Sequence, residues 1–106
     1  MSREPHERLA DALLHFDRAT AYGANGVATE LEIDAICMRL ASGLESLSRL
    51  PEEIRTELFG STWAAMWGMR NRIAHTYAQV EAPVVIATLE EDRPHIRTLI
   101  VDYLGR

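Results

Sequence analysis

The sequence predicts an all-α protein: an antiparallel four-helix bundle with one extra short helix, formed by a single domain over residues 1–106. Apolar side chains recur every three or four residues along four long segments of the chain. Glycine and proline interrupt this pattern at a few places, which leaves short connecting loops. Residues 84–86 (Val-Val-Ile) could form a lone β-strand, but the sequence offers no second strand to pair with it.

The first two helices are separated by a turn at residues 23–26 (Gly-Ala-Asn-Gly). Ser2 is expected to cap the first helix, with Pro5 in its opening turn. Thr29 is expected to open the second helix, which runs to about Leu50. The inner face of this helix is predicted to comprise Ile33, Ile36, Cys37, Leu40, Leu44 and Leu47, and its outer face Glu30, Glu32, Arg39 and Glu45.

The middle of the chain is predicted to hold a short third helix and the long fourth one. Gly43, inside the second helix, marks a position where another helix approaches closely. Pro51 starts the third helix and Gly60 stops it. Ser61 or Thr62 then caps the fourth helix, which ends soon after Tyr77. Three of its large residues are predicted to lie in the core: Trp63, Met66 and Trp67.

The last helix is predicted to begin near Pro83 and to be interrupted by Pro94. Because proline has no N–H to donate within a helix, we expect a kink near Asp92. The acidic residues just before this proline are predicted to form a solvated face or to pair with Arg93. Beyond the kink the apolar stripe continues through Ile96, Leu99, Ile100 and Tyr103.

Composition limits the possible functions. The net charge is −5, which argues against a general nucleic-acid coat, although all 11 basic residues are arginine and a local phosphate site stays possible. Cys37 is the single cysteine, so neither an internal disulfide nor a cysteine zinc site is expected. The histidines show no metal-ligand spacing, and no metal or cofactor is predicted. The chain has no apolar run near 20 residues and a charged N-terminus, which predicts a cytoplasmic protein outside the membrane.

The chemically richest stretch is residues 68–77, where Arg70, Asn71, Arg72, His75 and Tyr77 fall within ten positions. On a helix, Asn71 and His75 share one stripe, and Arg70 and Tyr77 share the next. These side chains can bind a phosphate and transfer a proton. One helix edge lines only half of a cleft, so a second surface must complete such a site.

A purely structural interpretation also fits the spacing. Arg70 and Arg72 suit the negative end of the helix dipole as surface charges. His75 can be a satisfied core histidine, and Tyr77 an amphipathic residue at the rim of the core. Arginine and histidine at this spacing do not by themselves define a site.

The wider pattern resembles the HepT-like group of HEPN ribonuclease toxins, whose signature is Arg-Asn-x-x-x-His-x-Tyr after Gly-Met and an upstream tryptophan. Residues 63–71 carry the tryptophan, the Gly-Met pair and Arg-Asn, and His75 and Tyr77 complete the signature. Residues 92–96 resemble the family's downstream Asp-x-Pro segment. One departure is in the second helix, where residues 40–43 stand for Ile-Gly-Glu-Ala and the glutamate is expected to be absent.

This resemblance implies a HEPN-like bundle that forms a two-fold homodimer with the motif helices facing each other. It implies a metal-independent endoribonuclease with a composite site of Arg70, Asn71 and His75 from both copies. Histidine can act as general base or acid on the 2′-hydroxyl and leaving oxygen, and arginine can stabilise charge on the phosphate. Asn71 would orient His75 or the phosphate, and Arg72 would bind the flanking RNA backbone.

The resemblance also implies a toxin of a type II or modification-based toxin–antitoxin pair. The expected partner is a minimal nucleotidyltransferase antitoxin that adenylylates Tyr77 and so blocks the RNA path. The alternative from another class is a catalytically inactive HEPN module that binds a nucleotidyltransferase or a nucleotide. A third interpretation is a plain helical dimerisation domain, which requires the motif match to be accidental.

Overall fold

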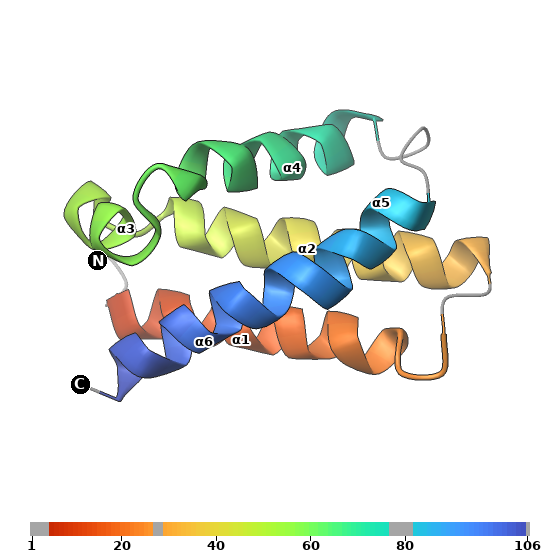
Figure 1. Ribbon diagram of the computed structural model, residues 1–106, viewed down its shortest axis with the longest axis horizontal. Helices are drawn as coiled ribbons and strands as arrows, with labels where there is room; N and C mark the ends of the chain where they lie inside the picture. Colours follow the sequence, from red (N-terminus) through yellow and green to blue (C-terminus); the bar gives the residue numbers. More distant parts are fainter. Residues whose placement is uncertain (1–4, 27–28, 77–81, 106) are drawn as a thin grey trace.

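The computed structural model describes residues 5–26, 29–76 and 82–105 of the chain, and every regular element in them is helical (Figure 1). The prediction of an all-α fold is therefore confirmed for this part of the chain. The helices are α1 (Pro5–Tyr22), α2 (Glu30–Ser48), α3 (Glu52–Phe59), α4 (Thr62–Thr76), α5 (Ala82–Ala87) and α6 (Arg93–Leu104). A π-helical segment, Thr88–Asp92, joins α5 to α6. Residues 84–86 belong to α5, so the alternative of a lone strand there is wrong.

The long helices reverse direction in turn, as Figure 1 shows for α1, α2, α4 and the rod formed by α5, the π segment and α6. α1 packs along α2, and α2 also packs against α4. The rod returns across this layer, and Arg97 on α6 donates a hydrogen bond from Nε to Asp17 Oδ1 on α1 at 2.9 Å. None of the described helices is long and apolar enough to cross a membrane.

All of these helices contribute side chains to a single core. Its buried hydrophobic residues are Leu9, Ala12, Phe16, Ala19, Ile36, Cys37, Leu40, Leu44, Leu47, Leu50, Leu58, Phe59, Met66, Ile73, Val85, Leu89, Ile96 and Ile100. Gly43 lies where α1 meets α2, and a Cβ atom added to it would stand 2.5 Å from Phe16 Cε1. The predicted close helix contact at this glycine is confirmed, because a buried aromatic ring occupies the space of its missing side chain.

Local chemistry sets the ends of the middle helices. Thr29 caps α2 through a capping box: its hydroxyl accepts from the backbone N–H of Glu32, whose side chain accepts from the Thr29 backbone N–H. Pro51 precedes α3, and Gly60 ends it with a φ of 54°, a left-handed conformation that favours glycine. These boundaries agree with the sequence prediction. The predicted cap at Ser2 lies outside the described residues.

Candidate functional site

Arg70 on α4 is held by three neighbouring side chains. Its guanidinium carbon lies 4.8 Å from the centre of the Trp67 ring, a cation–π contact. Its Nη1 donates a hydrogen bond to Asn71 Oδ1 at 3.2 Å, and its Nη2 lies 2.8 Å from Glu45 Oε2 on α2. The Arg70 side chain is still 24% exposed. A guanidinium that is held by three side chains and is still partly exposed can bind an anion from solvent.

Glu45 corrects two expectations about the second helix. We predicted that it lies on the outer face of that helix and that the glutamate of the family's Ile-Gly-Glu-Ala segment is absent from residues 40–43, which left the support of the motif by this helix unassigned. Its side chain is only 36% exposed, and its carboxylate bridges α2 to Arg70. Glu45 Oε2 is buried and accepts no well-aligned hydrogen bond from the described residues, so the contact with Arg70 is an ion pair. The other oxygen of this carboxylate, Glu45 Oε1, lies 3.7 Å from Arg49 Nη2. The Glu45 carboxylate therefore forms ion pairs with both Arg49 and Arg70.

An aromatic column runs along α4 and ends at Arg70. The rings of Phe59 and Trp63 stack at 6.1 Å between centroids, and those of Trp63 and Trp67 stack at 5.8 Å. Arg55 places its guanidinium 5.1 Å from the centre of the Trp63 ring. The prediction of a core role is confirmed for Met66, and Trp63 is partly buried against the core. It is wrong for Trp67, which is partly buried beside Arg70 but lies outside the core cluster.

The remaining motif residues are distributed around α4. His75 belongs to the helix, although its side chain lies outside the described part of the chain, as does the whole of Tyr77. Arg72 is exposed and lies about 200° around the helix from Arg70. In this register Asn71 and the backbone of His75 fall between the two arginines. The structure thus brings Arg70 and Asn71 into contact, while Arg72 lies on the opposite side of the helix from Arg70.

The outer face of α4 is open in the single chain. Ala64 is exposed, and a Cβ atom added to Gly68 would meet no atom of the described residues within 4 Å. Helical register places both residues on the same side as Asn71 and His75. The motif helix therefore presents small side chains on the face where the motif is centred.

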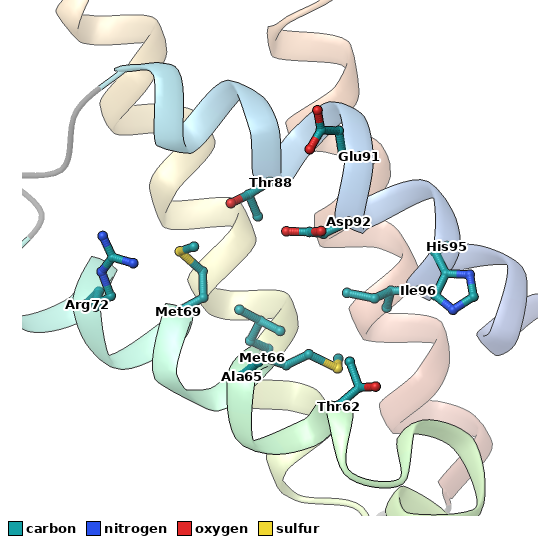
Figure 2. A pocket seen from close by; sticks show the side chains of 11 residues that line it. Thr62, Ala65, Met66, Met69, Arg72, Thr88, Glu91, Asp92, His95 and Ile96 are labelled. Carbon is teal, nitrogen blue, oxygen red and sulfur yellow. The ribbon is translucent and has the colours of Figure 1, made fainter.

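A groove of about 520 Å³ opens on the far side of Arg72, between α4 and the rod (Figure 2). We call it the α4–α6 groove. One wall comes from α4, the other from the π segment and α6, and α2 contributes to its base. The residues that line it are Leu44, Thr62, Ala65, Met66, Met69, Arg72, Thr88, Glu91, Asp92, His95 and Ile96. It joins an apolar interior to a rim with charges of both signs.

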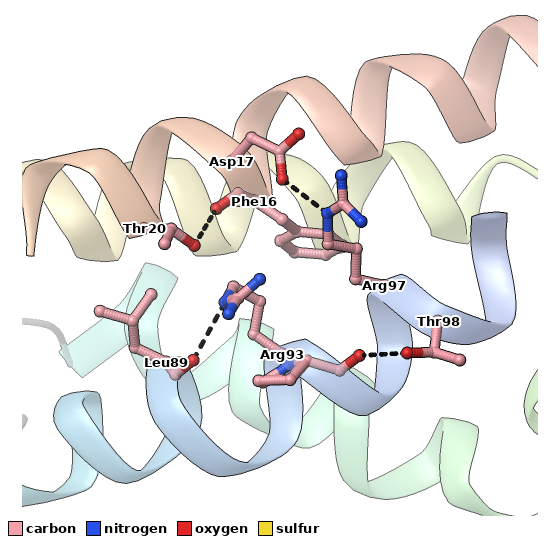
Figure 3. Close-up of polar contacts among 8 residues, drawn as sticks. Phe16, Asp17, Thr20, Leu89, Arg93, Arg97 and Thr98 are labelled. Carbon is pink, nitrogen blue, oxygen red and sulfur yellow. Dashed lines mark hydrogen bonds and ion pairs between the residues drawn. The ribbon is translucent and has the colours of Figure 1, made fainter. Parts of the chain in front are cut away.

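The second wall of the groove contains a π-helical segment that ends two residues before Pro94, and Figure 3 shows the contact of Arg93 with the Leu89 carbonyl beside it. Pro94 has no N–H to donate to the carbonyl four residues earlier, and the backbone N–H of Arg93 instead bonds to the Thr88 carbonyl. The Arg93 side chain donates from Nε to the Leu89 carbonyl at 3.0 Å. The helical irregularity predicted near Asp92 is therefore present as a π segment. Arg93 pairs with this backbone carbonyl rather than with the neighbouring acids as one prediction had it.

Sequence reasoning assigned no role to several residues that line the groove. Three of them are His95, Glu91 and Asp92. His95 belongs to no recognised motif, and the two acidic residues were expected to form a solvated face or to pair with Arg93. The useful signal was Pro94, because a break in a helical wall exposes and redirects the side chains beside it. In the described residues, no group of three histidine, cysteine, aspartate or glutamate side chains is placed to hold a metal ion.

Comparison with known proteins identifies the family. The model of the family described as ribonuclease HepT-like matches residues 9–102, which includes the whole motif and both walls of the groove. Comparisons with curated proteins and with solved structures returned no match. A match over this length, together with the motif on α4, shows that the chain belongs to the HepT-like ribonuclease family.

Proposed function

We propose that this protein is a metal-independent endoribonuclease and the toxin of a toxin–antitoxin pair. Membership of the HepT-like family implies ribonuclease activity in general terms. The observation that supports this chemistry best is the arrangement of Arg70, held by Trp67, Asn71 and Glu45 at a partly open surface of α4. Its backbone position is just over one turn before His75 on the same helix.

The proposed reaction needs three tasks that these residue types can perform without a metal. A base removes the proton from the 2′-hydroxyl, whose oxygen attacks the adjacent phosphorus, and an acid protonates the leaving 5′-oxygen. Two copies of His75 divide the base and acid roles, since imidazole titrates near neutral pH. Arg70 stabilises the charge on the phosphate oxygens, and Asn71, hydrogen-bonded to Arg70, keeps its fork oriented.

The proposed active form is a two-fold dimer in which the α4 helices face each other. The small residues Ala64 and Gly68 on the open face of α4 permit a close approach of two helices. Such a contact brings both copies of Asn71 and His75 to the dimer axis and both copies of Arg70 and Arg72 to its flanks. The positive charge is then concentrated in one cleft of an acidic protein.

The proposed antitoxin is a minimal nucleotidyltransferase that acts on Tyr77 in the cytoplasm. An AMP group on this side chain adds a negative charge and bulk close to the motif, which blocks the approach of RNA. Intact mass of the protein, produced with and without such a partner, tests the modification. An unmodified Tyr77 after co-expression would count against this part of the proposal.

The decisive experiment is cleavage of single-stranded RNA in EDTA by the wild type and by the Arg70→Ala and His75→Ala variants. We expect Arg70→Ala to slow cleavage by about 10²–10³-fold, as is typical when a donor to a developing anion is removed. His75→Ala should lose about 10²–10⁴-fold, the usual contribution of a general acid or base. Arg18→Ala is the matched control, because Arg18 is an exposed arginine on α1 and lies outside the motif.

The inactive-module alternative predicts a different result. In that case the wild type, purified without a modifying partner, would cleave no RNA, and both variants would match it. Equal activity of the wild type and the Arg18→Ala variant, with loss in the two motif variants, supports the enzyme. Circular dichroism of all four proteins checks that the helical fold is retained.

A further inference from the structure

We propose that the α4–α6 groove is a subsite for one base of the RNA substrate, next to the cleaved phosphate, and that Asp92 selects guanine there. This inference rests on the proposed ribonuclease function and adds the recognition of the substrate to it. It concerns a surface on the other side of Arg72 from Arg70, outside the motif itself.

The interior of the groove suits the flat face of a base. Met66 and Met69 extend into it from α4, and Ile96 faces them from α6 (Figure 2). Methionine side chains are polarizable and adaptable, and they make favourable contacts with aromatic rings. The volume of about 520 Å³ falls in the range of roughly 300–1,000 Å³ that is typical of small-molecule sites. An unstacked nucleoside is a ligand of this class.

Asp92 supplies the selectivity. Its carboxylate is directed into the groove toward the α4 side, whereas Glu91 points away from it (Figure 2). Asp92 makes no hydrogen bond or ion pair with other described residues, so its two oxygens are available as acceptors. A carboxylate accepts two parallel N–H bonds from a planar donor pair. Guanine presents N1–H and N2–H side by side, while the Watson–Crick edges of adenine, cytosine and uracil each place an acceptor beside the donor.

The position of the groove relative to the motif determines the path of the RNA strand across α4. Arg72 lines the groove and, by helical register, lies one turn before His75. A nucleotide whose base enters the groove can therefore set its phosphate beside Arg72 and continue toward the His75 face. The Asp92 carboxylate on the opposite wall repels phosphate, so this wall favours a base edge over the RNA backbone.

The test uses a pool of single-stranded RNAs with randomised bases, cut by the full-length protein, followed by sequencing of the new ends. We expect the wild type to favour guanine by roughly tenfold at one position next to the cut, as hydrogen bonds to a charged group allow. In Asp92→Asn this preference should fall below about twofold, because an amide presents one acceptor and one donor. Glu90→Gln is the matched control: Glu90 is exposed on the same π segment but does not line the groove, and its variant should keep the preference.

A second measurement separates failure of the subsite from failure of the proposed enzyme. The same pool is bound to Arg70→Ala protein with and without Asp92→Asn, and the retained RNAs are sequenced. Cleavage with no guanine preference, or a preference that survives Asp92→Asn, overturns the subsite and leaves the ribonuclease standing. If no RNA is cut, enrichment of guanine that depends on Asp92 still supports the subsite. Absence of both cleavage and enrichment overturns both, and a protein segment becomes the occupant to seek.

Discussion

Arg70 Nη2 on α4 and Glu45 Oε2 on α2 lie 2.8 Å apart, which joins the motif helix to the centre of the bundle by an ion pair. The Glu45 carboxylate thereby keeps Arg70 beside Asn71 and over the Trp67 ring. In the proposed function, the same carboxylate also pairs with the guanidinium to which an RNA phosphate would bind. Glu45 therefore has two opposed effects on the proposed site: it positions Arg70, and it competes with the substrate for it.

Replacing Glu45 by glutamine should separate these effects. Removing one negative charge beside Arg70 is expected to tighten RNA binding several-fold, because phosphate no longer competes with a carboxylate. Turnover should fall by about tenfold, since Arg70 is less well oriented.

The free energy of unfolding of this variant should change by less than about 1 kcal/mol, as is usual for a partly exposed ion pair. Titration of labelled RNA and single-turnover cleavage measure the two effects, with Glu52→Gln as the control on an exposed glutamate. Unchanged RNA affinity would show that Glu45 does not compete.

Trp67 should matter for turnover more than for folding. Its side chain is partly buried and contacts the Arg70 guanidinium in a cation–π arrangement, which is worth about 0.5–1 kcal/mol at an exposed site. Trp67→Leu is expected to lower kcat several-fold with little change in KM or in melting temperature. Trp67→Phe keeps an aromatic face and should recover most of the rate. A loss of stability as large as the loss of rate would instead assign Trp67 a structural role.

The two glycines inside helices should respond in opposite ways to alanine. Gly43→Ala places a Cβ atom 2.5 Å from the buried Phe16 ring and should destabilise the fold by about 1–3 kcal/mol, as overpacking does. Gly68→Ala meets no described atom within 4 Å and should stabilise the isolated chain by up to about 1 kcal/mol through helix propensity. Urea unfolding of both variants at equal protein concentration measures the difference. Equal shifts of one sign would contradict the packing argument.

Stability should depend on the charge state of His15. Burial lowers the pKa of this histidine, and the charge of Arg39 lowers it further, while Asp11 opposes the shift. Arg39 Nη1 lies 3.2 Å from His15 Nδ1, a contact that requires the neutral ring as acceptor. Since the pKa of His15 is lower in the folded state, the stabilisation is present above the unfolded value of about 6.5 and is lost as the pH falls through the folded value.

Thermal melts between pH 7.5 and 5.5 should show a steeper fall of the melting temperature for the wild type than for His15→Gln, which keeps an acceptor but does not titrate. Parallel curves would exclude His15 as a source of this dependence.

The fold was largely predictable because its signals are local. Thr29 and Glu32 form the capping box that begins α2, and Gly60 adopts the left-handed conformation that ends α3. Pro94 predicted the irregularity before α6, since a missing N–H acts on the adjacent turn whatever surrounds it. Each of these features depends on residues within a few positions of one another.

The candidate site was only partly predictable, because it depends on which helices meet. Arg70 and Asn71 were identified from the motif, but the contact of Arg70 with Glu45 joins residues that are 25 positions apart. Trp67 was assigned to the core because its helical spacing fits an inner face, whereas its ring is only partly buried and packs against the Arg70 guanidinium. The groove lined by Asp92 exists because α4 and the rod leave a space between them, with Leu44 of α2 at its base. The sequence does not show this spacing.

The sequence by itself determined the helical segments, the cap of α2, the two ends of α3 and the motif on α4, because capping, periodicity and proline chemistry act over one or two turns. Only the tertiary structure decided that Glu45 faces Arg70, that Trp67 is partly buried beside Arg70 rather than in the core, and that a groove opens beside Arg72. Those features follow from the rotation of each helix about its axis and from the spacing between helices. Both are fixed by the packing of the whole core rather than by any single segment.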